Sequence, residues 1–382
     1  MTTASRDRVD TSVTIRKVSD KAELKTFIDY PYKKYANDPL WVPPLRMDEW
    51  DKFNSEKNPF YEHARMELFL AERAGKVVGR IAAIDNDAHN TVYTGDNLAF
   101  FGFFEAEDQG AATALFSEVE KYAKSIGRTH VRGPANPSMD DGAGFQLSGY
   151  DTLPYIMMIQ NPPEYPTFAE VAGYSKIKDL YAFRLVSSIG ISDKIKKLAE
   201  RVRKRTNFTI RPLNMKDYNN EVQRVLDFYN EEWEANWGHI KYTDKQAKLL
   251  AKQLKLIVDP ELILFMELEG NIIGVGMGFP DANQMLQKIK DGRLIPFGIL
   301  PFLNKRKIIN RTRMTILGVR KPYRNKGLEI VLIDEFAKRA LARGYVECEC
   351  SWELEDNEAI NNGIIAAGGE LYKTYRMYQK DL

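Results

Sequence analysis

The chain is poor in the side chains that most often bind metals or cross-link proteins. Its 382 residues include two cysteines and four histidines. Cys348 and Cys350 lie too close together for a disulfide, and we interpret them as buried thiols. Such scarcity of cysteine is typical of a reducing cytoplasm. The histidines show no metal-ligand spacing, so we expect no metal cofactor.

Long apolar runs and an excess of charge are also missing. No uncharged apolar run reaches the ~18 residues that span a bilayer, and residues 1–12 lack the apolar core of a signal peptide. Lysine and arginine (55) nearly balance aspartate and glutamate (53), and the net charge of +2 does not favour wholesale nucleic-acid binding. We expect a cytoplasmic protein, at most peripheral to the inner face of the membrane, with no nucleic-acid partner.

What the chain does contain is an internal repeat. The Thr-Ile-Arg of 14–16 recurs at 209–211, and the Gly-Lys-Val-Val-Gly of 75–79 recurs as Gly-Asn-Ile-Ile-Gly at 270–274. At 44% hydrophobic residues, each half is long enough for its own core. The repeat predicts two domains, 13–186 and 207–382, joined by a basic helical linker at 187–206.

Hydrophobic periodicity predicts the same order of elements in each half. In the first half we expect strands at 13–18, 67–72, 76–85, 98–105, 129–132 and 179–185, with helices at 21–36, 109–126 and near 168. In the second half we expect strands at 208–212, 262–266, 271–278, 313–319, 345–352 and 371–379, with helices at 217–237, 244–257, 328–343 and near 357. The fold class is therefore α/β, with two tandem units that are each a mixed, mostly antiparallel sheet flanked by helices.

A basic loop joins the predicted strand at 313–319 to the helix at 328–343. It reads Val-Arg-Lys-Pro-Tyr-Arg-Asn-Lys-Gly-Leu-Glu from 319 to 329. Free N–H groups at a helix start, a glycine that lets a ligand approach and several cations together fit a diphosphate. Glu329 adds a carboxylate that a phosphate would repel. An ordinary polar helix start is the alternative.

These residues resemble the GNAT superfamily of CoA-dependent N-acyltransferases, whose central loop reads Arg/Gln-x-x-Gly-x-Gly/Ala. Arg324-x-x-Gly327 matches that loop and Glu329 departs from it. The family's downstream helix matches at Asn357 but has Ile364 where many relatives place a tyrosine general acid. The resemblance implies a site for acetyl-CoA or a longer acyl-CoA, formed by Gly318, Val319, Arg320, Lys321, Arg324, Asn325, Lys326, Gly327, Leu328 and Asn357. The tandem arrangement looks like a bacterial family of double-GNAT proteins, to which some ceramide synthases are distantly similar.

The corresponding loop of the first half is acidic. Glu107 takes the place of Arg324, and Glu105 lies nearby, while Gly110 is kept. Each carboxylate near a phosphate would cost on the order of 1 kcal/mol. We therefore predict that the second half binds the acyl-CoA. The first half would be a degenerate copy that helps to build the acceptor site or stabilises the pair.

Acyl transfer to an amine requires a base and a polarised thioester carbonyl. A backbone N–H near Gly318 would polarise the carbonyl. Glu349, and after it Asp356, are the predicted bases, because the strand end and turn around them are rich in acids. A solvated strand edge and a helix cap are the alternative reading. Tyr372 and Tyr375 are substitutes for the missing general acid.

Two segments suggest acceptor contacts. The polar, glycine-rich loop at 133–142 follows a predicted strand, and Asn-Trp-Gly at 236–238 lies at the end of a predicted helix. From them we predict acceptor binding by Asn136, Asp140, Asp141, Asn236 and Trp237. A plain surface loop and core packing of the tryptophan are the alternatives.

An insertion in the second half is both apolar and basic. Residues 294–303 are almost wholly apolar, and residues 288–313 contain eight basic residues against one acid, Asp291. This pattern is typical of a segment that lies against anionic lipid. A pocket for an acyl chain and a hydrophobic plug between the halves are the alternatives.

Two classes of function therefore compete. The first is an N-acyltransferase that uses acyl-CoA and a small-molecule or lipid amine, as Arg324-x-x-Gly327 suggests. The second is a non-catalytic pseudoenzyme that binds a metabolite or partner, which Glu329 and Ile364 favour. A third reading, with aminoacyl-tRNA as donor, would use the basic linker.

Overall fold

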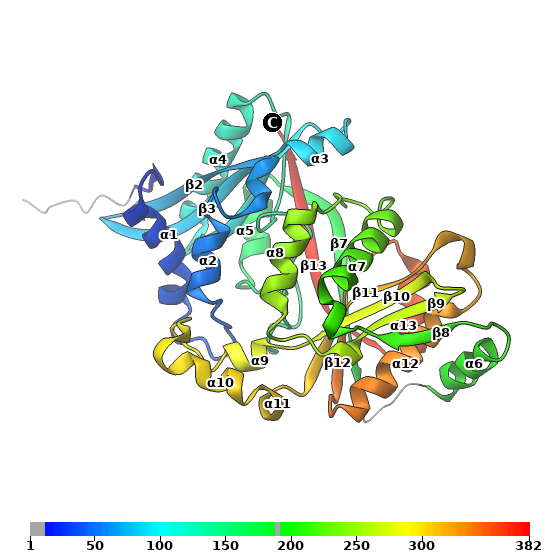
Figure 1. Ribbon diagram of the computed structural model, residues 1–382. Coiled ribbons are helices and arrows are strands. Elements are labelled where there is room, and N and C mark those ends of the chain that lie inside the picture. The colour runs from blue at the N-terminus through cyan, green and yellow to red at the C-terminus, as the bar shows by residue number, and fades with distance from the viewer. Residues whose placement is uncertain (1–11, 188–191) are drawn as a thin grey trace, which may run out of the picture.

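The computed structural model of the protein (Figure 1) describes residues 12–187 and 192–382, and it confirms the repeated order of elements. The first half contains β1 (Thr14–Lys17), α1 (Lys21–Lys34), α2 (Arg46–Lys52), β2 (Ala64–Arg73), β3 (Lys76–Asn86), α3 (Asp87–Val92), β4 (Leu98–Ala106), α4 (Gln109–Ser125), β5 (His130–Gly133), β6 (Phe145–Gln146), α5 (Tyr165–Val171) and β7 (Ser175–Val186). After the linker helix α6 (Asp193–Arg203), the second half contains β8 (Thr209–Pro212), α7 (Tyr218–Glu232), α8 (Asp244–Leu254), β9 (Ile263–Leu268), β10 (Asn271–Pro280), β11 (Arg311–Val319), α12 (Leu328–Ala342), β12 (Glu347–Leu354), α13 (Glu358–Ala366) and β13 (Glu370–Asp381).

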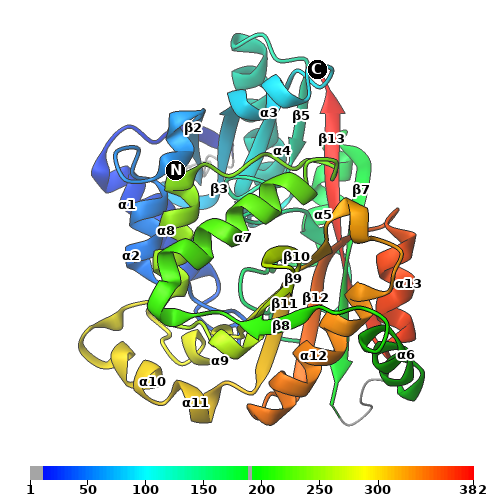
Figure 2. The ribbon, with the colours of Figure 1, turned by 45° about the vertical axis from the view of Figure 1, so that its right-hand side comes forward.

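The strands of the described residues form one continuous sheet, because the two halves exchange their last strands. The order is β1-β2-β3-β4-β5-β13-β7-β12-β11-β10-β9-β8, with β6 paired to β13. β13 comes from the end of the second half but lies between β5 and β7, and β7 in turn pairs with β12. Figures 1 and 2 show β13, in red, extending beside the first half to the C-terminus. Each half therefore needs a strand from the other to complete its sheet.

Alternate side chains of the second-half strands face two different layers of helices. Leu264 and Met266 of β9 pack in the same cluster as Val331 of α12. Phe265, between them, packs in another cluster with Phe228 of α7. Because successive side chains of a strand point to opposite faces, α12 and α7 cover opposite faces of the sheet.

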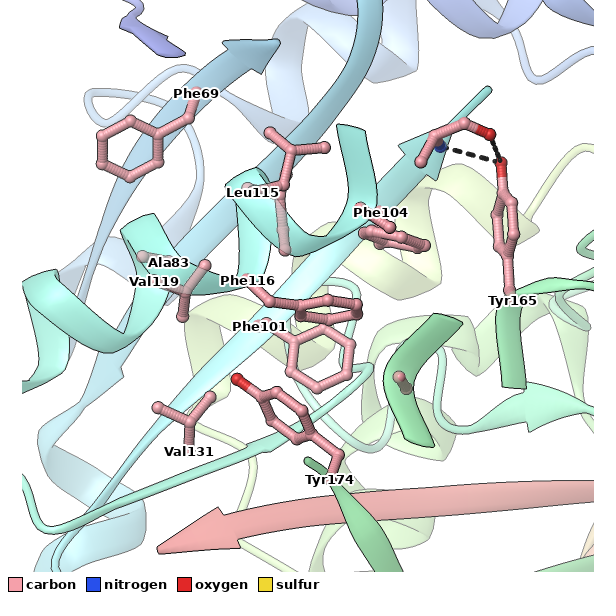
Figure 3. Close-up of a cluster of buried hydrophobic side chains, with 14 of the residues drawn as sticks. Phe69, Ala83, Phe101, Phe104, Leu115, Phe116, Val119, Val131, Tyr165 and Tyr174 are labelled. Atoms are coloured by element: carbon pink, nitrogen blue, oxygen red, sulfur yellow. Dashed lines mark hydrogen bonds between the residues drawn. The ribbon is translucent and has the colours of Figure 1, made fainter. Parts of the chain in front are cut away.

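Aromatic rings fill the space between α4, α5 and the sheet in the first half (Figure 3). Phe104 stacks on Phe116 with ring centroids 4.7 Å apart, and it meets the ring of Tyr165 at 4.9 Å. The Tyr165 hydroxyl donates to Glu105 Oε2 at 2.6 Å and accepts from the backbone N–H of Ala106 at 3.1 Å. The end of β4 is thus closed by the protein's own side chains.

The insertion between β10 and β11 lies on the surface. It contains α9 (Asn283–Leu286), η4 (Leu294–Gly298), α10 (Ile299–Leu303) and α11 (Lys305–Ile308). Ile295, Phe297 and Leu303 are exposed, so the alternative that this run is a plug buried between the halves is wrong. These helices are too short to show a helical period in the sequence.

Across residues 12–187 and 192–382, every helix is too short or too polar to cross a bilayer.

Candidate active site

The second half opens between β11 and β12. The strands are paired and parallel from 311–314 to 347–350, and they separate beyond these residues. Thr315 is the extra residue of a bulge, because its two neighbours on β11 pair with consecutive residues of β10. We predicted a polarising backbone N–H near Gly318, but the irregularity of β11 lies earlier, at Thr315, while Gly318 and Val319 remain paired with β10.

Two pockets on opposite faces of the sheet meet at this opening. The first, here called the α12 pocket, has a volume of about 180 Å³ and is walled by β11, β12, α12 and α13. The second, the α7 pocket, has a volume of about 290 Å³ and is walled by α7, α8, the sheet and the loop at 139–143. Six residues line both pockets: Trp233, Asn236, Thr315, Ile316, Trp352 and Leu354. A ligand in one pocket can therefore meet a ligand in the other.

The loop before α12 presents an uncapped helix start. Gly327 precedes the first helical residue with a φ of 76°, and it provides no side-chain cap. The first backbone N–H groups of α12 are therefore free to bind an anion. Lys321 and Lys326 are exposed beside this helix start and make no ion pair within the described residues.

Two of the four predicted diphosphate cations are already paired. Arg324 Nη2 lies 2.7 Å from Glu232 Oε2, and Arg320 donates to Glu231. Both acids end α7, so they tie the loop to the other face of the sheet. The attraction for an anion rests on the helix N–H groups, Lys321 and Lys326 more than on the arginines.

The other predicted donor-site residues have different surroundings. Val319 and Leu328 are buried, and a Cβ at Gly318 would lie 2.7 Å from the ring of Trp233. Asn325 is exposed. Asn357 caps α13, accepting from the backbone N–H of Ile360, and lines the α12 pocket.

The equivalent helix start in the first half is closed by a carboxylate. Asp108 Oδ1 accepts from the backbone N–H of Ala111 at 3.0 Å, and Arg73 binds the same carboxylate with two hydrogen bonds of 2.5 and 2.9 Å. These bonds lower the pKa of Asp108 to about 2. Ala106 and Val319 occupy equivalent strand ends, since they pair with Gly79 and Gly274. In the first half both the helix start and the strand end are therefore occupied by protein groups.

Glu349, the first predicted base, lies away from both pockets. Its side chain is fully buried and accepts from Ser351 Oγ at 2.6 Å and from the hydroxyl of Tyr372. The same carboxylate lies 3.7 Å from Arg313 Nε. Arg313 lines the α7 pocket, so Glu349 is placed to hold this buried guanidinium in position.

Asp356 and Tyr375 also lie away from the pockets. Asp356 is exposed at its carboxylate and pairs with Lys178 Nζ at 2.7 Å. Tyr375 is fully buried behind Trp352, with ring centroids 6.0 Å apart.

Three of the five predicted acceptor residues line the α7 pocket: Asp140, Asn236 and Trp237. The other two shape the loop that carries Asp140. Asn136 Oδ1 accepts from the backbone N–H of Phe103 at 2.5 Å, and Asp141 Oδ2 accepts from Ser138 Oγ at 2.7 Å.

Two carboxyl groups with raised pKa values lie on the two sides of the opening. In the α7 pocket, burial raises the pKa of Asp140 to about 7, and the hydroxyl of Tyr229 donates to its Oδ1 at 3.2 Å. In the α12 pocket, burial raises the pKa of Glu353 to about 7. Both groups are poised to exchange protons near neutral pH.

Two comparisons cover nearly the whole chain. It is 34% identical over 386 aligned positions to a protein of Caulobacter vibrioides named bacterial ceramide synthase, covering 98% of this chain and 99% of that protein. It is 32% identical to protein YghO of Escherichia coli K12, covering 96% and 95%. Among solved structures, a tandem GNAT protein from the clavulanic acid biosynthesis pathway matches with a TM-score of 0.57 at 12% identity, over 97% of this chain and 98% of that one. The chain belongs to the family of bacterial ceramide synthase and YghO, and it shares the fold of the tandem GNAT protein.

A second solved GNAT protein, from Sphaerobacter thermophilus, matches with a TM-score of 0.52 at 12% identity over 97% of this chain and 95% of that one. No model of a known protein family matches the chain. The resemblance inferred from the loop and the repeat is thereby confirmed for the tandem GNAT fold.

Sequence reasoning missed two polar groups of this candidate site. His239 is buried in the α7 pocket, and neither ring nitrogen has a hydrogen-bond partner within the described residues. Burial lowers its pKa to about 4. Trp352 Nε1, at the opening, also lacks a partner there. The one sequence signal for His239 was its position directly after Asn-Trp-Gly. Trp352 lies in the acid-rich strand end that we searched for a base.

Proposed function

We propose that this protein is an N-acyltransferase that moves an acyl group from acyl-CoA to the amine of a lipid or small-molecule acceptor. The observation that carries the proposal is the meeting of two pockets at a strand opening, beside an uncapped helix start. The name of one relative, bacterial ceramide synthase, supports a long-chain amine as acceptor, because a ceramide is the N-acyl derivative of such an amine.

The donor side is the α12 face. The first N–H groups of α12, with Lys321 and Lys326, would hold the diphosphate. The largely apolar wall of the α12 pocket would hold the pantetheine arm, and Asn357 lies along it. Acyl-CoA would supply the thioester. A backbone N–H at the Thr315 bulge is the nearest equivalent of the predicted polarising group.

The acceptor side is the α7 face. Its wall is rich in leucine, valine, isoleucine and aromatic side chains, which suits an aliphatic chain. Each buried methylene contributes about 0.8 kcal/mol. Asp140 carries the ionisable carboxyl group of this wall, so we assign it the role of the base that removes a proton from the amine. His239 and Trp352 Nε1 are unpaired groups that a polar head of the acceptor would satisfy.

The proton balance uses both carboxyl groups. The amine nitrogen bonds to the thioester carbonyl carbon, and the carbon–sulfur bond breaks. Ionised Asp140 accepts the proton that the amine loses, and protonated Glu353 gives a proton to the departing thiolate. Glu353 would thus take the role that the family's tyrosine, replaced here by Ile364, has in many relatives.

Calorimetric titration with acetyl-CoA and with palmitoyl-CoA tests the donor site. We expect micromolar binding of at least one, weakened about tenfold or more by the double variant Lys321→Glu/Lys326→Glu, since each reversed charge costs on the order of 1 kcal/mol. Preferential binding of palmitoyl-CoA would indicate lipid N-acylation.

The matched control is Lys121→Glu/Lys124→Glu. It makes the same change of charge on exposed residues of α4, and it should leave the affinity unchanged. Loss of binding in the control alone would place the donor in the first half. Absence of binding to either compound in the wild type would favour the non-catalytic alternative.

A further inference from the structure

The insertion between β10 and β11 exposes a cluster of large apolar side chains. Ile295, Phe297, Ile299, Leu300 and Leu303 are 82%, 77%, 45%, 52% and 74% exposed. They come from η4 and α10, which Figures 1 and 2 show at an outer edge of the molecule, in yellow. Scattered exposed apolar residues are ordinary, but five within nine positions form a patch.

Basic side chains flank this patch on both sides. Lys288, Lys290 and Arg293 precede it, and Arg306 and Lys307 follow it; all five are exposed. None of the five forms an ion pair within the described residues, although the protein's other surfaces carry many such pairs. The charge at this edge is therefore uncompensated by the protein itself.

The segment that carries the patch is held to the rest of the protein by hydrogen bonds and apolar contacts. The backbone N–H of Arg46 donates to the carbonyl of Gly292 at 2.9 Å, and Arg46 Nε donates to the carbonyl of Asp291 at 2.7 Å. On its inner side, Phe302 packs in the same apolar cluster as Leu254 and Val258. The exposed apolar side chains thus belong to a segment that is anchored at its N-terminal end and along its inner face.

The base of the patch adjoins the α7 pocket. Leu254 and Val258, which contact the cluster under Phe302, also line that pocket. Leu254 and Val258 therefore separate the exposed patch from the α7 pocket, which is the proposed acceptor site.

We propose that residues 288–307 dock on the surface of an anionic lipid bilayer. The apolar side chains would enter the acyl boundary and the flanking bases would meet the phosphate headgroups. A second copy of the chain fits less well, because a two-fold contact would bring the same unpaired bases together. The role of this contact rests on the proposed N-acyltransferase function, because a long-chain amine acceptor would enter the site from the bilayer. Vesicle binding itself does not depend on that function.

Flotation of the full chain with vesicles tests the surface without any acyl donor. We expect co-flotation with phosphatidylcholine vesicles that contain about one-third phosphatidylglycerol, falling steeply as salt is raised, and little with pure phosphatidylcholine. The variant Ile295→Ser/Phe297→Ser should reduce the bound fraction about tenfold or more, as expected from losing two inserted apolar side chains. Arg306→Glu/Lys307→Glu should reduce binding to the anionic vesicles.

The matched control is Val171→Ser/Ile365→Ser. Both side chains are exposed and apolar but lie on α5 and α13, and the control should float like the wild type. Failure of the wild type to bind anionic vesicles, or equal binding by Ile295→Ser/Phe297→Ser, would overturn the proposal. So would light scattering that shows a dimer dissociated by that variant. Calorimetry should show that Ile295→Ser/Phe297→Ser binds acyl-CoA with unchanged affinity. A loss of vesicle binding in this variant is thereby distinguished from a failure of the donor site.

Discussion

Asp140 and Glu349 are both carboxylates considered as bases, and their surroundings differ. Asp140 lies in the wall of the α7 pocket with one hydrogen-bond donor, the hydroxyl of Tyr229. Glu349 is fully buried, accepts from Ser351 and Tyr372, and faces Arg313. A base must reach the proton that it removes, so the geometry favours Asp140, with Glu349 as the residue that positions Arg313.

The variant Asp140→Asn should lower kcat/KM by about 10²-fold, the usual worth of a general base. In the wild type, kcat/KM should rise with pH up to about 7, because only the ionised carboxylate of Asp140 accepts a proton and its pKa is about 7. Above about pH 7 it should fall, because only protonated Glu353 gives a proton to the thiolate and its pKa is also about 7. Asp140→Asn should abolish that rise. Initial rates of amide formation from pH 5 to 9 check both outcomes.

Two controls make this test specific. Asp227→Asn changes an exposed carboxylate on α7, near Tyr229 in the chain, and should leave the rates unchanged. Glu349→Gln should reduce stability by about 3–5 kcal/mol, as when a buried charge loses its partner, but keep the pH profile. Loss of the pH rise in Glu349→Gln, with retention in Asp140→Asn, would restore Glu349 as the base.

Individual site residues differ in how well the sequence predicts their surroundings. The positions of Gly327 and Asn357 at helix starts could be predicted, because the family motif fixes their spacing. The burial of Glu349 could not, because an acid-rich strand looks the same whether its carboxylates face water or a buried arginine. Tyr229 bonds to Asp140, and His239 lines the same pocket, only because one half packs against the other.

At the scale of elements, the two copies of the strand–helix unit differ in what fills them. In the first, Phe104, Phe116 and Tyr165 pack ring to ring between α4 and β4. In the second, the corresponding side of α12 borders a pocket of about 180 Å³, with Ile333 in its wall. The charges of the two loops and the filling of the two interiors both indicate that the second copy, and not the first, has room for a ligand.

Phe116→Ala and Ile333→Ala test that division at equivalent helical positions. Phe116→Ala should cost about 3–5 kcal/mol of unfolding free energy, because it empties a packed core. Ile333→Ala should cost about 1 kcal/mol, since its side chain already borders a pocket, and should change the relative affinity for palmitoyl-CoA and acetyl-CoA. Urea unfolding and calorimetry measure these effects. Equal destabilisation by both would contradict the difference in packing.

The order of elements was predictable because each long helix and strand has its own hydrophobic period. The short helices α9 to α11 were not, because too few turns exist to show a period. Charge and apolarity did single out residues 288–313, but whether that run faces water or the interface is decided by tertiary contacts such as those of Arg46 with Gly292.

At the scale of the whole molecule, the exchange of β7 and β13 joins the two halves. Tyr378, on β13, is fully buried in the core of the first half, and Phe183, on β7, is buried in the core of the second. The sequence repeat predicted two units but not this pairing, because periodicity does not specify which strand is a neighbour.

The exchange predicts one cooperative unfolding transition. Tyr378→Ala and Phe183→Ala should each destabilise the chain by about 3–5 kcal/mol and shift the same calorimetric transition downward. Two separate transitions, with each variant shifting only one, would show that the halves unfold independently. Differential scanning calorimetry distinguishes these results.

A chain that gave up either copy would be left with a gap in its sheet, whatever that copy binds. The first copy can thus change at every position that once could have met a nucleotide, provided that it still supplies β7 and accepts β13. Its persistence requires no activity of its own. After the exchange of β7 and β13, neither copy can be lost without unfolding the other.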